Sequence, residues 1–468
     1  MDELLDAERE AGVADGVVAR LRETFATGTT RLIAWRRAQL SALERMLDEQ
    51  GGAIEEVLAQ DLGKPPLEAY LSEIASTRAE IRALLAGLGR WSRPERVRLP
   101  VALQPGRAHV RREPLGVVLV IAPWNYPVNL VLAPLAAALA AGNCVVVKPS
   151  EVTARTSALL ASLLPRYLDD RAVAVVEGGP EVNQALIAQR VDHVFFTGSS
   201  AVGRLVMQAA AAQLTPVTLE LGAKSPAIVS RDANLAVAAR RVAWGRFFNA
   251  GQTCVAPDYV LVERAVADAF TGLVADAVRA FYGADPRTSA DFARIVDDRH
   301  LVRLAGLLEH HGGALVTGGV VEREARYVAP TVLRDVDPAA PVMQEEIFGP
   351  ILPILPVEDL DEAVRFVAAR PTPLTVYLFA RDRRCARRVA AETRSGALSV
   401  NATLQHFAVP ALPFGGLGES GIGAYHGRWG FEAFSHRRAV LARPARADLA
   451  LLYPPYSRRA GAFLRRLL

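Results

Sequence analysis

A thiol, a carboxylate and an amide are the side chains of this chain that are best suited to chemistry. Cys254 lies in a glycine-containing loop within FFNAGQTCVAP, and a cysteine thiolate is the strongest common side-chain nucleophile. Most single cysteines are small buried hydrophobic residues, but a loop position beside Gln252 and Thr253 is less typical of core filling. Cys254 is therefore the candidate nucleophile.

Two further residues have properties that would assist such a nucleophile. Glu220 ends the mostly apolar segment VTLEL, where burial raises the pKa of a carboxyl group and suits it to act as a general base. A glutamate paired with a cation at a domain seam is the structural alternative. Asn125 lies in PWNYP, after an apolar run, and its amide could hold a developing oxyanion. A turn between two prolines would explain the same segment.

Two segments have features of a nucleotide-binding site. In VVVKPSE, Lys148 and Glu151 follow a strand-like run and could bind the two hydroxyls of a ribose, and a solvated turn is the alternative. In FFTGSSAVG, Gly198 and Gly203 flank a strand-to-helix turn, where unpaired backbone N–H groups favour a phosphate. This segment is neither a GxGxxG fingerprint nor a P-loop, so a simple tight turn also fits it.

Two later segments add acids and glycines. MQEEIFGP, residues 343–350, contains the paired acids Glu345 and Glu346 beside Phe348, which suit sugar or metal contacts or simply a charged loop. PFGGLGESGIGAYHG, residues 413–427, is dense in glycine, which indicates tight turns or close approach of the backbone.

Composition restricts the class of protein. Hydrophobic residues make up 51% of the chain and the net charge is only +4, without a basic stripe, which argues for a globular protein and against nucleic-acid binding. Three cysteines far apart argue against a disulfide framework or a cysteine metal site and favour a reducing compartment. The acidic start MDELLDAERE is not a signal peptide. Prolines interrupt the uncharged stretch between Glu113 and Lys148, so we expect no membrane span there.

The order of elements predicts an α/β fold. Apolar residues at helical spacing indicate helices over residues 1–95, and the apolar run over residues 117–122 indicates a strand buried on both faces. Helical and strand-like segments then alternate, which predicts βαβ units and a parallel sheet. A second α/β series begins near Gly222, without a flexible linker, so we place a domain break near residue 221 and expect the domains to pack closely.

Together these segments resemble the aldehyde dehydrogenase superfamily. PWNYP, KPSE, FTGS with a glycine four residues on, LELG, GQTC, EEIFGP and PFGG occur in the order and spacing of that family, over nearly the whole chain. LTPVTLELGAKSP, GQTCVAPDY and the late GAYHG look like its class 3 branch, which includes fatty, aromatic and coniferyl aldehyde dehydrogenases.

The resemblance implies two Rossmann-like α/β domains with parallel sheets and a small oligomerisation arm. The NAD(P)-binding domain would span residues 1–221, with a β-arm near 96–116, and the catalytic domain would span residues 222–410. Residues 411–468 would return to the cofactor domain, join the oligomerisation arm and end in a basic amphipathic tail. Dimers dominate in the family, so a homodimer is implied.

The resemblance also implies the role of each site residue. Cys254 matches the nucleophile, Glu220 the general base, and Asn125 the oxyanion donor, which shares that task with the backbone N–H of Cys254. The residues that match cofactor contacts are Trp124, Lys148, Glu151, Gly198, Ser199, Gly203, Glu346 and Phe348. The cofactor would be NAD or NADP, and no metal is implied. Ala223 replaces the second glycine of the usual LELGG, and it would strain the turn after Glu220 if that position requires a positive φ.

The implied reaction is NAD(P)-dependent oxidation of a long-chain aliphatic or aromatic aldehyde to the carboxylic acid. Cys254 adds to the aldehyde, hydride passes to the nicotinamide, and water activated by Glu220 hydrolyses the thioester. A CoA-acylating aldehyde dehydrogenase is the nearest alternative, although Glu220 favours water. A cofactor-independent cysteine hydrolase or esterase is the second, but none of the eight histidines lies near Cys254 in the sequence.

The C-terminal tail YPPYSRRAGAFLRRLL has the composition of a short basic amphipathic helix. Its apolar and basic residues are Phe463, Leu464, Leu467, Leu468, Arg458, Arg459, Arg465 and Arg466. Such a helix could lie on an anionic membrane surface, or it could pack on the protein itself. We expect a cytoplasmic protein, with peripheral membrane contact through the tail as one alternative.

Replacing Cys254 by alanine is expected to abolish aldehyde-dependent reduction of NAD(P), because alanine cannot form the covalent intermediate. The cofactor should still bind to the variant, since its contacts lie elsewhere. Absorbance of the reduced cofactor measures turnover, and a fluorescence titration measures cofactor binding. Substantial remaining turnover would remove Cys254 as the nucleophile.

Overall fold

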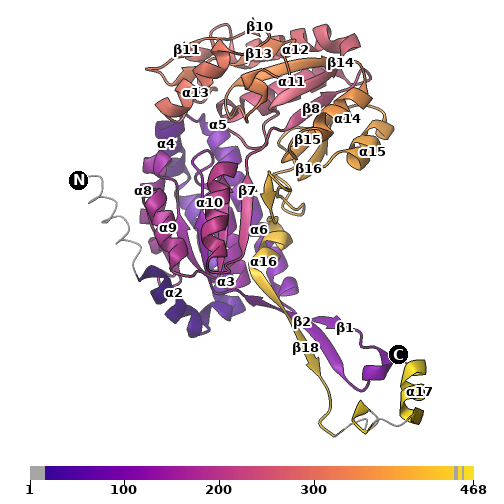
Figure 1. Ribbon diagram of the computed structural model, residues 1–468. Coiled ribbons are helices and arrows are strands. Elements are labelled where there is room, and N and C mark those ends of the chain that lie inside the picture. Colours follow the sequence, from indigo (N-terminus) through magenta and orange to yellow (C-terminus); the bar gives the residue numbers. More distant parts are fainter. Residues whose placement is uncertain (1–15, 447–451, 456–457, 468) are drawn as a thin grey trace.

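The computed structural model describes residues 16–446, 452–455 and 458–467, and it contains two mostly parallel sheets and one antiparallel arm (Figure 1). The first sheet has the order β17-β7-β6-β3-β4-β5 and is parallel except for β17. Its strands are β3 (Val117–Ile121), β4 (Cys144–Lys148), β5 (Val173–Val175), β6 (His193–Gly198), β7 (Val217–Leu221) and β17 (Gly421–Ile422). Every residue of β3 and β4 is buried, as their continuous apolar runs predict.

Helices cover both faces of the first sheet. Those associated with it are α2 (Val17–Ala26), α3 (Ile33–Glu49), α4 (Gly51–Leu62), α5 (Pro66–Ala69), a π-helical turn (Tyr70–Ala75), α6 (Ser76–Trp91), α7 (Asn129–Ala141), α8 (Ala154–Tyr167), α9 (Pro180–Ala188), α10 (Ser200–Ala211) and α16 (Gly427–Ala433). Apolar residues of α3, α6, α7 and α8 pack on one face, and those of α2, α9 and α10 on the other. Helix α7 is buried along its whole length and ends at Gly142, whose φ of 95° is left-handed, as its sequence predicts.

The second sheet has the order β10-β13-β14-β9-β8-β15-β16, and only β10 is antiparallel. Its strands are β8 (Pro226–Val229), β9 (Tyr259–Glu263), β10 (Ala314–Thr317), β13 (Thr331–Arg334), β14 (Ile351–Val357), β15 (Thr375–Phe379) and β16 (Ala397–Val400). The accompanying elements are α11 (Leu235–Phe247), α12 (Ala267–Tyr282), α13 (Asp298–Glu309), α14 (Leu360–Ala368), α15 (Arg383–Glu392) and a short hairpin of β11 (Val321–Glu322) and β12 (Tyr327–Val328). The two mostly parallel sheets, each packed against helices, confirm the predicted α/β fold class.

The two sheets follow each other almost directly in the chain. Strand β7 ends at Leu221 and β8 begins at Pro226, so only residues 222–225 separate them. The domain break that the sequence predicts near residue 221 stands at the start of this segment, whose shortness brings the ends of the two sheets together. The loops at these ends line the candidate site described below.

An antiparallel arm projects from the body of the molecule (Figure 1). It consists of β1 (Glu95–Val97), β2 (Arg107–Pro114) and β18 (Ser435–Ala442), with Ser435 paired to Pro114. Helix α17 (Arg458–Leu467) lies beside the far end of the arm (Figure 1). Among the described residues, the helices are too short or too polar to span a bilayer.

Glu80 gives the packing of α6 on α16 a dependence on pH. It is buried in α6 and accepts a hydrogen bond from the backbone N–H of Gly427, at the start of α16, at 2.5 Å. Burial raises the pKa of this carboxyl group to about 7. The Glu80 carboxyl group therefore binds its proton more tightly in the folded protein than in the unfolded chain. The stability that this proton contributes is complete below the unfolded pKa and is lost as the pH rises through 7.

Glu80→Gln is expected to become more stable than the native protein as the pH is raised from 5 to 8. Glutamine keeps the acceptor for Gly427 and has no charge to bury, so the gain should reach roughly 3 kcal/mol at most. Thermal midpoints at matched pH measure the difference, and the exposed Glu23→Gln is the matched control. A difference that does not change with pH would contradict the assignment.

Candidate active site

One cavity of about 680 Å³ brings the three candidate catalytic residues together. Asn125 reaches it from the loop after β3, Glu220 from the end of β7, and Cys254 from the loop after α11. The predicted cofactor residues that also line the cavity are Trp124, Gly198, Ser199, Glu346 and Phe348. The predicted residues outside its lining are Lys148, Glu151 and Gly203.

The loop that carries Cys254 begins with an abrupt reversal of the chain. Asn249, Ala250 and Gly251 all have left-handed φ values, of 53°, 51° and 75°. At Gly251 a side chain would collide with the carbonyl oxygen of Gly349, so the glycine of GQTC is required by both its backbone angle and its surroundings.

Gln252 fixes the next part of this loop. Its amide donates to the carbonyl oxygens of Asn249 and Arg294, both at 3.0 Å, and its own oxygen accepts from the N–H of Val296 at 3.0 Å. The side chain is buried, and both of its polar atoms are hydrogen-bonded. Gln252 is therefore a structural residue that ties the Cys254 loop to the segment containing Arg294 and Val296.

The neighbours of Cys254 are held by two tyrosines. Tyr126 Oη shares a hydrogen bond of 2.5 Å with Thr253 Oγ1, and Tyr377 Oη donates to the carbonyl of Val255 at 2.5 Å. Cys254 itself is partly exposed to the cavity. Burial, followed by the nearby carboxylates of Glu346 and Glu220, raises the pKa of its thiol to about 12. The thiol form therefore predominates near neutral pH.

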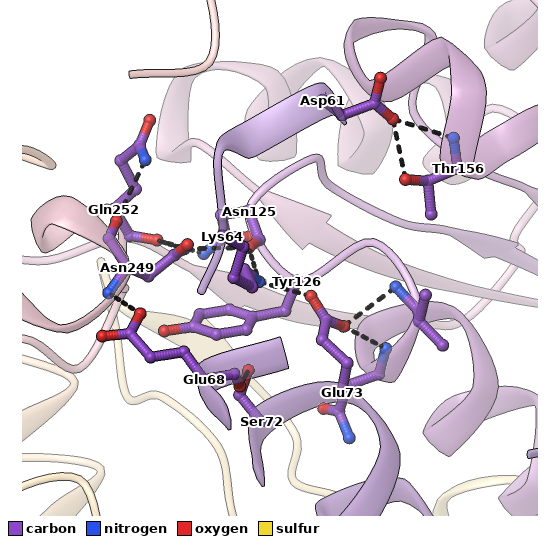
Figure 2. Close-up of polar contacts among 12 residues, drawn as sticks. Asp61, Lys64, Glu68, Ser72, Glu73, Asn125, Tyr126, Thr156, Asn249 and Gln252 are labelled. Atoms are coloured by element: carbon purple, nitrogen blue, oxygen red, sulfur yellow. Dashed lines mark hydrogen bonds and ion pairs between the residues drawn. The ribbon is translucent and has the colours of Figure 1, made fainter. Parts of the chain in front are cut away.

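Asn125 is hydrogen-bonded directly to the Cys254 loop (Figure 2). Its side-chain Nδ2 donates to the carbonyl of Gln252 at 3.0 Å, and its backbone carbonyl accepts from Asn249 Nδ2, also at 3.0 Å. The side chain is only 2% exposed. This bond uses one hydrogen of the Asn125 amide, and the second hydrogen is available to an oxygen atom in the cavity.

Glu220 is a buried carboxylate without a charged partner among the described residues. It lies opposite Gly421 of β17, and neither of its oxygens has a hydrogen bond to the described part of the chain. Burial raises its pKa well above the usual range of a carboxyl group. The alternative of a glutamate ion-paired at the domain seam is therefore wrong, and the carboxyl group faces the cavity.

The turn after Glu220 accommodates Ala223 without backbone strain. Ala223 is not among the described residues with a positive φ, so this position does not require glycine. At the preceding Gly222, a side chain would displace the carboxylate of Glu346, so glycine there leaves that carboxylate in place. The concern that Ala223 distorts the site is thus removed.

Glu346 and Phe348 are positioned through the backbone of residues 345–349. Lys224 donates to the carbonyl of Glu345 at 2.9 Å, and Arg303 donates to those of Glu346 and Ile347 at 3.3 and 2.5 Å. Phe348 packs edge-on against Trp124, with their ring centroids 5.3 Å apart.

Asp258 is the common acceptor of this arrangement. It binds Lys224 at 2.5 Å and Arg246 at 2.8 Å, and it accepts from the N–H of Ile347. Arg246 is fully buried and also donates to the carbonyl of Gly349. The sequence analysis did not identify Asp258, Arg246 or Lys224. Their signal was an isolated charge beside or within a predicted apolar element, where a charge needs a buried partner.

The predicted ribose-binding pair lies at the end of β4. Lys148 is buried, and its Nζ binds Glu151 Oε2 at 2.7 Å, while the Glu151 side chain is about half exposed. Gly203 lies against Leu221, where a larger residue would push α10 away from β7. Ser199 caps the N-terminus of α10 by accepting from the N–H of Val202 at 3.3 Å. Within the described residues, no cluster of three or more His, Cys, Asp and Glu side chains could hold a metal ion.

Comparison with known proteins matches nearly the whole chain. A profile of the aldehyde dehydrogenase family matches residues 7–440. The dimeric NADP-preferring aldehyde dehydrogenase of Rattus norvegicus is 46% identical over 94% of this chain and 97% of its own. Aldehyde dehydrogenase family 3 member B1 of Homo sapiens is 48% identical over 94% of both chains. The substrate-bound structure of Staphylococcus aureus AldH superposes with a TM-score of 0.94 at 41% identity, and the match covers 97% of this chain and 99% of that one.

Proposed function

Because the chain belongs to the aldehyde dehydrogenase family and oxidises an aldehyde to the carboxylic acid with NAD or NADP, we propose that Cys254, Glu220 and Asn125 carry the reaction. The observation that supports these roles most is their convergence on one cavity. The hydrogen bond between Asn125 and the loop of Cys254 links two of them directly.

In the first step, Cys254 Sγ bonds to the carbonyl carbon and the carbonyl oxygen becomes an anion. The free hydrogen of the Asn125 amide and the backbone N–H of Cys254 stabilise that oxygen. Because burial raises the pKa of the Cys254 thiol, its proton must first be lost to solvent before the sulfur attacks the aldehyde.

In the second half of the reaction, the thioester on Cys254 is hydrolysed. Glu220 takes a proton from water, the oxygen of that water bonds to the acyl carbon, and the carbon–sulfur bond breaks to release the acid. Because burial raises the pKa of Glu220, its basic form, and with it the hydrolysis rate, increases as the pH rises.

The residues around the cavity suit a dinucleotide. The carboxylate of Glu346 would hold the nicotinamide ribose, and Phe348 and Trp124 would flank the ring. Gly198 and Ser199, at the N-terminus of α10, and Gly203, which keeps that helix close to β7, would serve the phosphates. Lys148 and Glu151 would bind the adenosine ribose. When bound, NAD or NADP accepts hydride from the substrate carbon.

The substrate side of the cavity favours an apolar aldehyde. The apolar residues of the lining include Leu130, Leu374, Phe414 and Tyr425. Long-chain aliphatic or aromatic aldehydes would bury their side chains against these groups. Transfer of the acyl group to CoA is the alternative fate of the thioester. The unpartnered carboxyl oxygens of Glu220, which could deprotonate water, support hydrolysis instead.

The two sheets support separate domains for cofactor binding and for catalysis. Residues 1–221 would form the cofactor domain, which contains β3 to β7, and residues 222–410 the catalytic domain, which contains β8 to β16. Residues 411–468 return to the first sheet as β17 and to the arm as β18. As in its dimeric relative, the chain forms a homodimer, and the arm would contribute to that dimer.

We also propose that the C-terminal tail lies on an anionic membrane surface of the cytoplasm. Its backbone forms helix α17, and Arg458, Arg459 and Arg465 are exposed. The side chains of Phe463, Leu464, Arg466 and Leu467, and the whole of Leu468, lie outside the described residues. Exposed arginines on a short terminal helix support attraction to anionic lipids.

Glu220→Gln is expected to produce a burst of about one reduced cofactor per site, followed by steady turnover slower by roughly 10²- to 10⁴-fold. Glutamine cannot deprotonate water, so the thioester accumulates. Stopped-flow absorbance measures both phases. The exposed cavity glutamate Glu419, paired with Arg204, gives the matched control Glu419→Gln. Loss of the burst in a folded Glu220→Gln protein would show that Glu220 acts before deacylation.

Deletion of residues 457–468 is expected to weaken binding to phosphatidylserine vesicles by at least about tenfold, because it removes four arginines. Sedimentation with vesicles measures the binding, and phosphatidylcholine vesicles are the control. Turnover of a short soluble aldehyde should not change. Equal binding of the full-length and truncated proteins would contradict the proposal.

A further inference from the structure

A fully buried ion pair lies beneath the catalytic loops. Lys64, after α4, and Glu73, in the π-helical turn, are 2.6 Å apart between Nζ and Oε1, and both side chains have no exposed surface. Burying two charges costs free energy that their mutual attraction barely recovers, so such a pair contributes little net stability. Its remaining contacts therefore indicate what it does.

The other contacts of the two charged groups go to one short stretch of the chain, residues 125–129, between β3 and the start of α7 (Figure 2). Lys64 Nζ donates to the carbonyl oxygen of Asn125 at 3.1 Å and lies 4.3 Å from the centroid of the Tyr126 ring. Glu73 Oε2 accepts from the N–H groups of Val128 and Asn129, at 3.1 and 2.8 Å. The pair thus holds both ends of the segment that carries Asn125.

The same segment is bonded to the loop of the nucleophile. The Asn125 carbonyl accepts a second hydrogen bond from Asn249, whose own N–H donates to Glu68 at 2.9 Å. Tyr126, beneath which Lys64 lies, bonds to Thr253. A shift of Lys64 would therefore change the distance between the Asn125 amide and Cys254.

We propose that Lys64 and Glu73 are positioning residues for the oxyanion site, which hold the Asn125 amide at the distance from Cys254 that the acylation step requires. The inference rests on the proposed role of Asn125. Donors to an oxyanion act only within a narrow range of distances, and a displacement of about 1 Å can cost about 100-fold in rate.

The test is the rate of the pre-steady-state burst of reduced cofactor in Lys64→Met, which has a side chain of similar length without the charge. We expect the burst to slow by roughly 10- to 100-fold, while the dissociation constant of NAD(P) stays within about twofold. Glu73→Gln keeps the shape of the pair and should slow the burst less. It provides the same test if Lys64→Met does not fold.

The matched control is Arg36→Met. Arg36 is a buried cation that donates to the carbonyl of Thr30 at 3.0 Å. It also donates to the carbonyl of Ala140 at 3.4 Å, at the end of α7 opposite to Asn129. The Arg36→Met variant should have a lower thermal midpoint than the native protein, but its burst should be as fast. An equal slowing in Arg36→Met and Lys64→Met would overturn the proposal, because it would show a general effect of destabilising the helix.

A double-mutant cycle with Asn125→Ala identifies the residue through which Lys64 acts. Asn125→Ala alone should slow the burst by about 10²- to 10³-fold, and adding Lys64→Met should then change it by less than about threefold. Full additivity would overturn the positioning role while leaving the function of Asn125 intact. A native burst in Asn125→Ala would overturn the role of Asn125 and this inference with it.

Discussion

The geometry of the proposed catalytic site depends on one constraint, the hydrogen bonding between two loops that come from different sheets. The loop after β3 carries Asn125, and the loop after α11 carries Cys254. Asn249 donates from its side chain to carbonyls in both loops, to that of Asn125 at 3.0 Å and to that of Gln252 at 3.2 Å. A relative movement of the two sheets would break these bonds, so the short connection between β7 and β8 and the close packing of the domains serve the chemistry directly.

The charged side chains around the cavity are of two kinds, those that are ion-paired and one that is left without a partner among the described residues. Asp258 neutralises the buried Arg246 and the half-buried Lys224, and these hold the backbone that presents Glu346 and Phe348. Glu220 differs from Asp258, because neither of its carboxyl oxygens has a hydrogen-bond partner among the described residues. Paired charges give rigidity where we propose that the cofactor binds, and the unpartnered carboxyl group of Glu220 keeps its capacity to take a proton.

The sequence was sufficient to predict most of the fold and to identify Cys254, Glu220 and Asn125, which line one cavity, but not the residues that support them. Apolar periodicity identifies β3, α7 and β4, because burial on both faces leaves continuous runs. Cys254, Glu220 and Asn125 stand out because polar groups follow apolar strands or helices. Lys64 could not be found in this way, since DLGKPP resembles a solvated turn and its partner Asn125 lies 61 residues away. The φ value of Ala223 likewise has no signature in the sequence.

The high pKa of the Cys254 thiol affects how well the enzyme resists chemical inactivation when no substrate is bound. Peroxides and alkylating agents react with thiolates far faster than with thiols, and oxidation beyond the sulfenic acid is not readily reversed. Burial of Sγ, followed by the nearby carboxyl groups of Glu346 and Glu220, keeps the sulfur protonated while no reactants are bound. The sulfur that is proposed to attack electrophilic aldehydes is thus expected to resist oxidation and alkylation between turnovers.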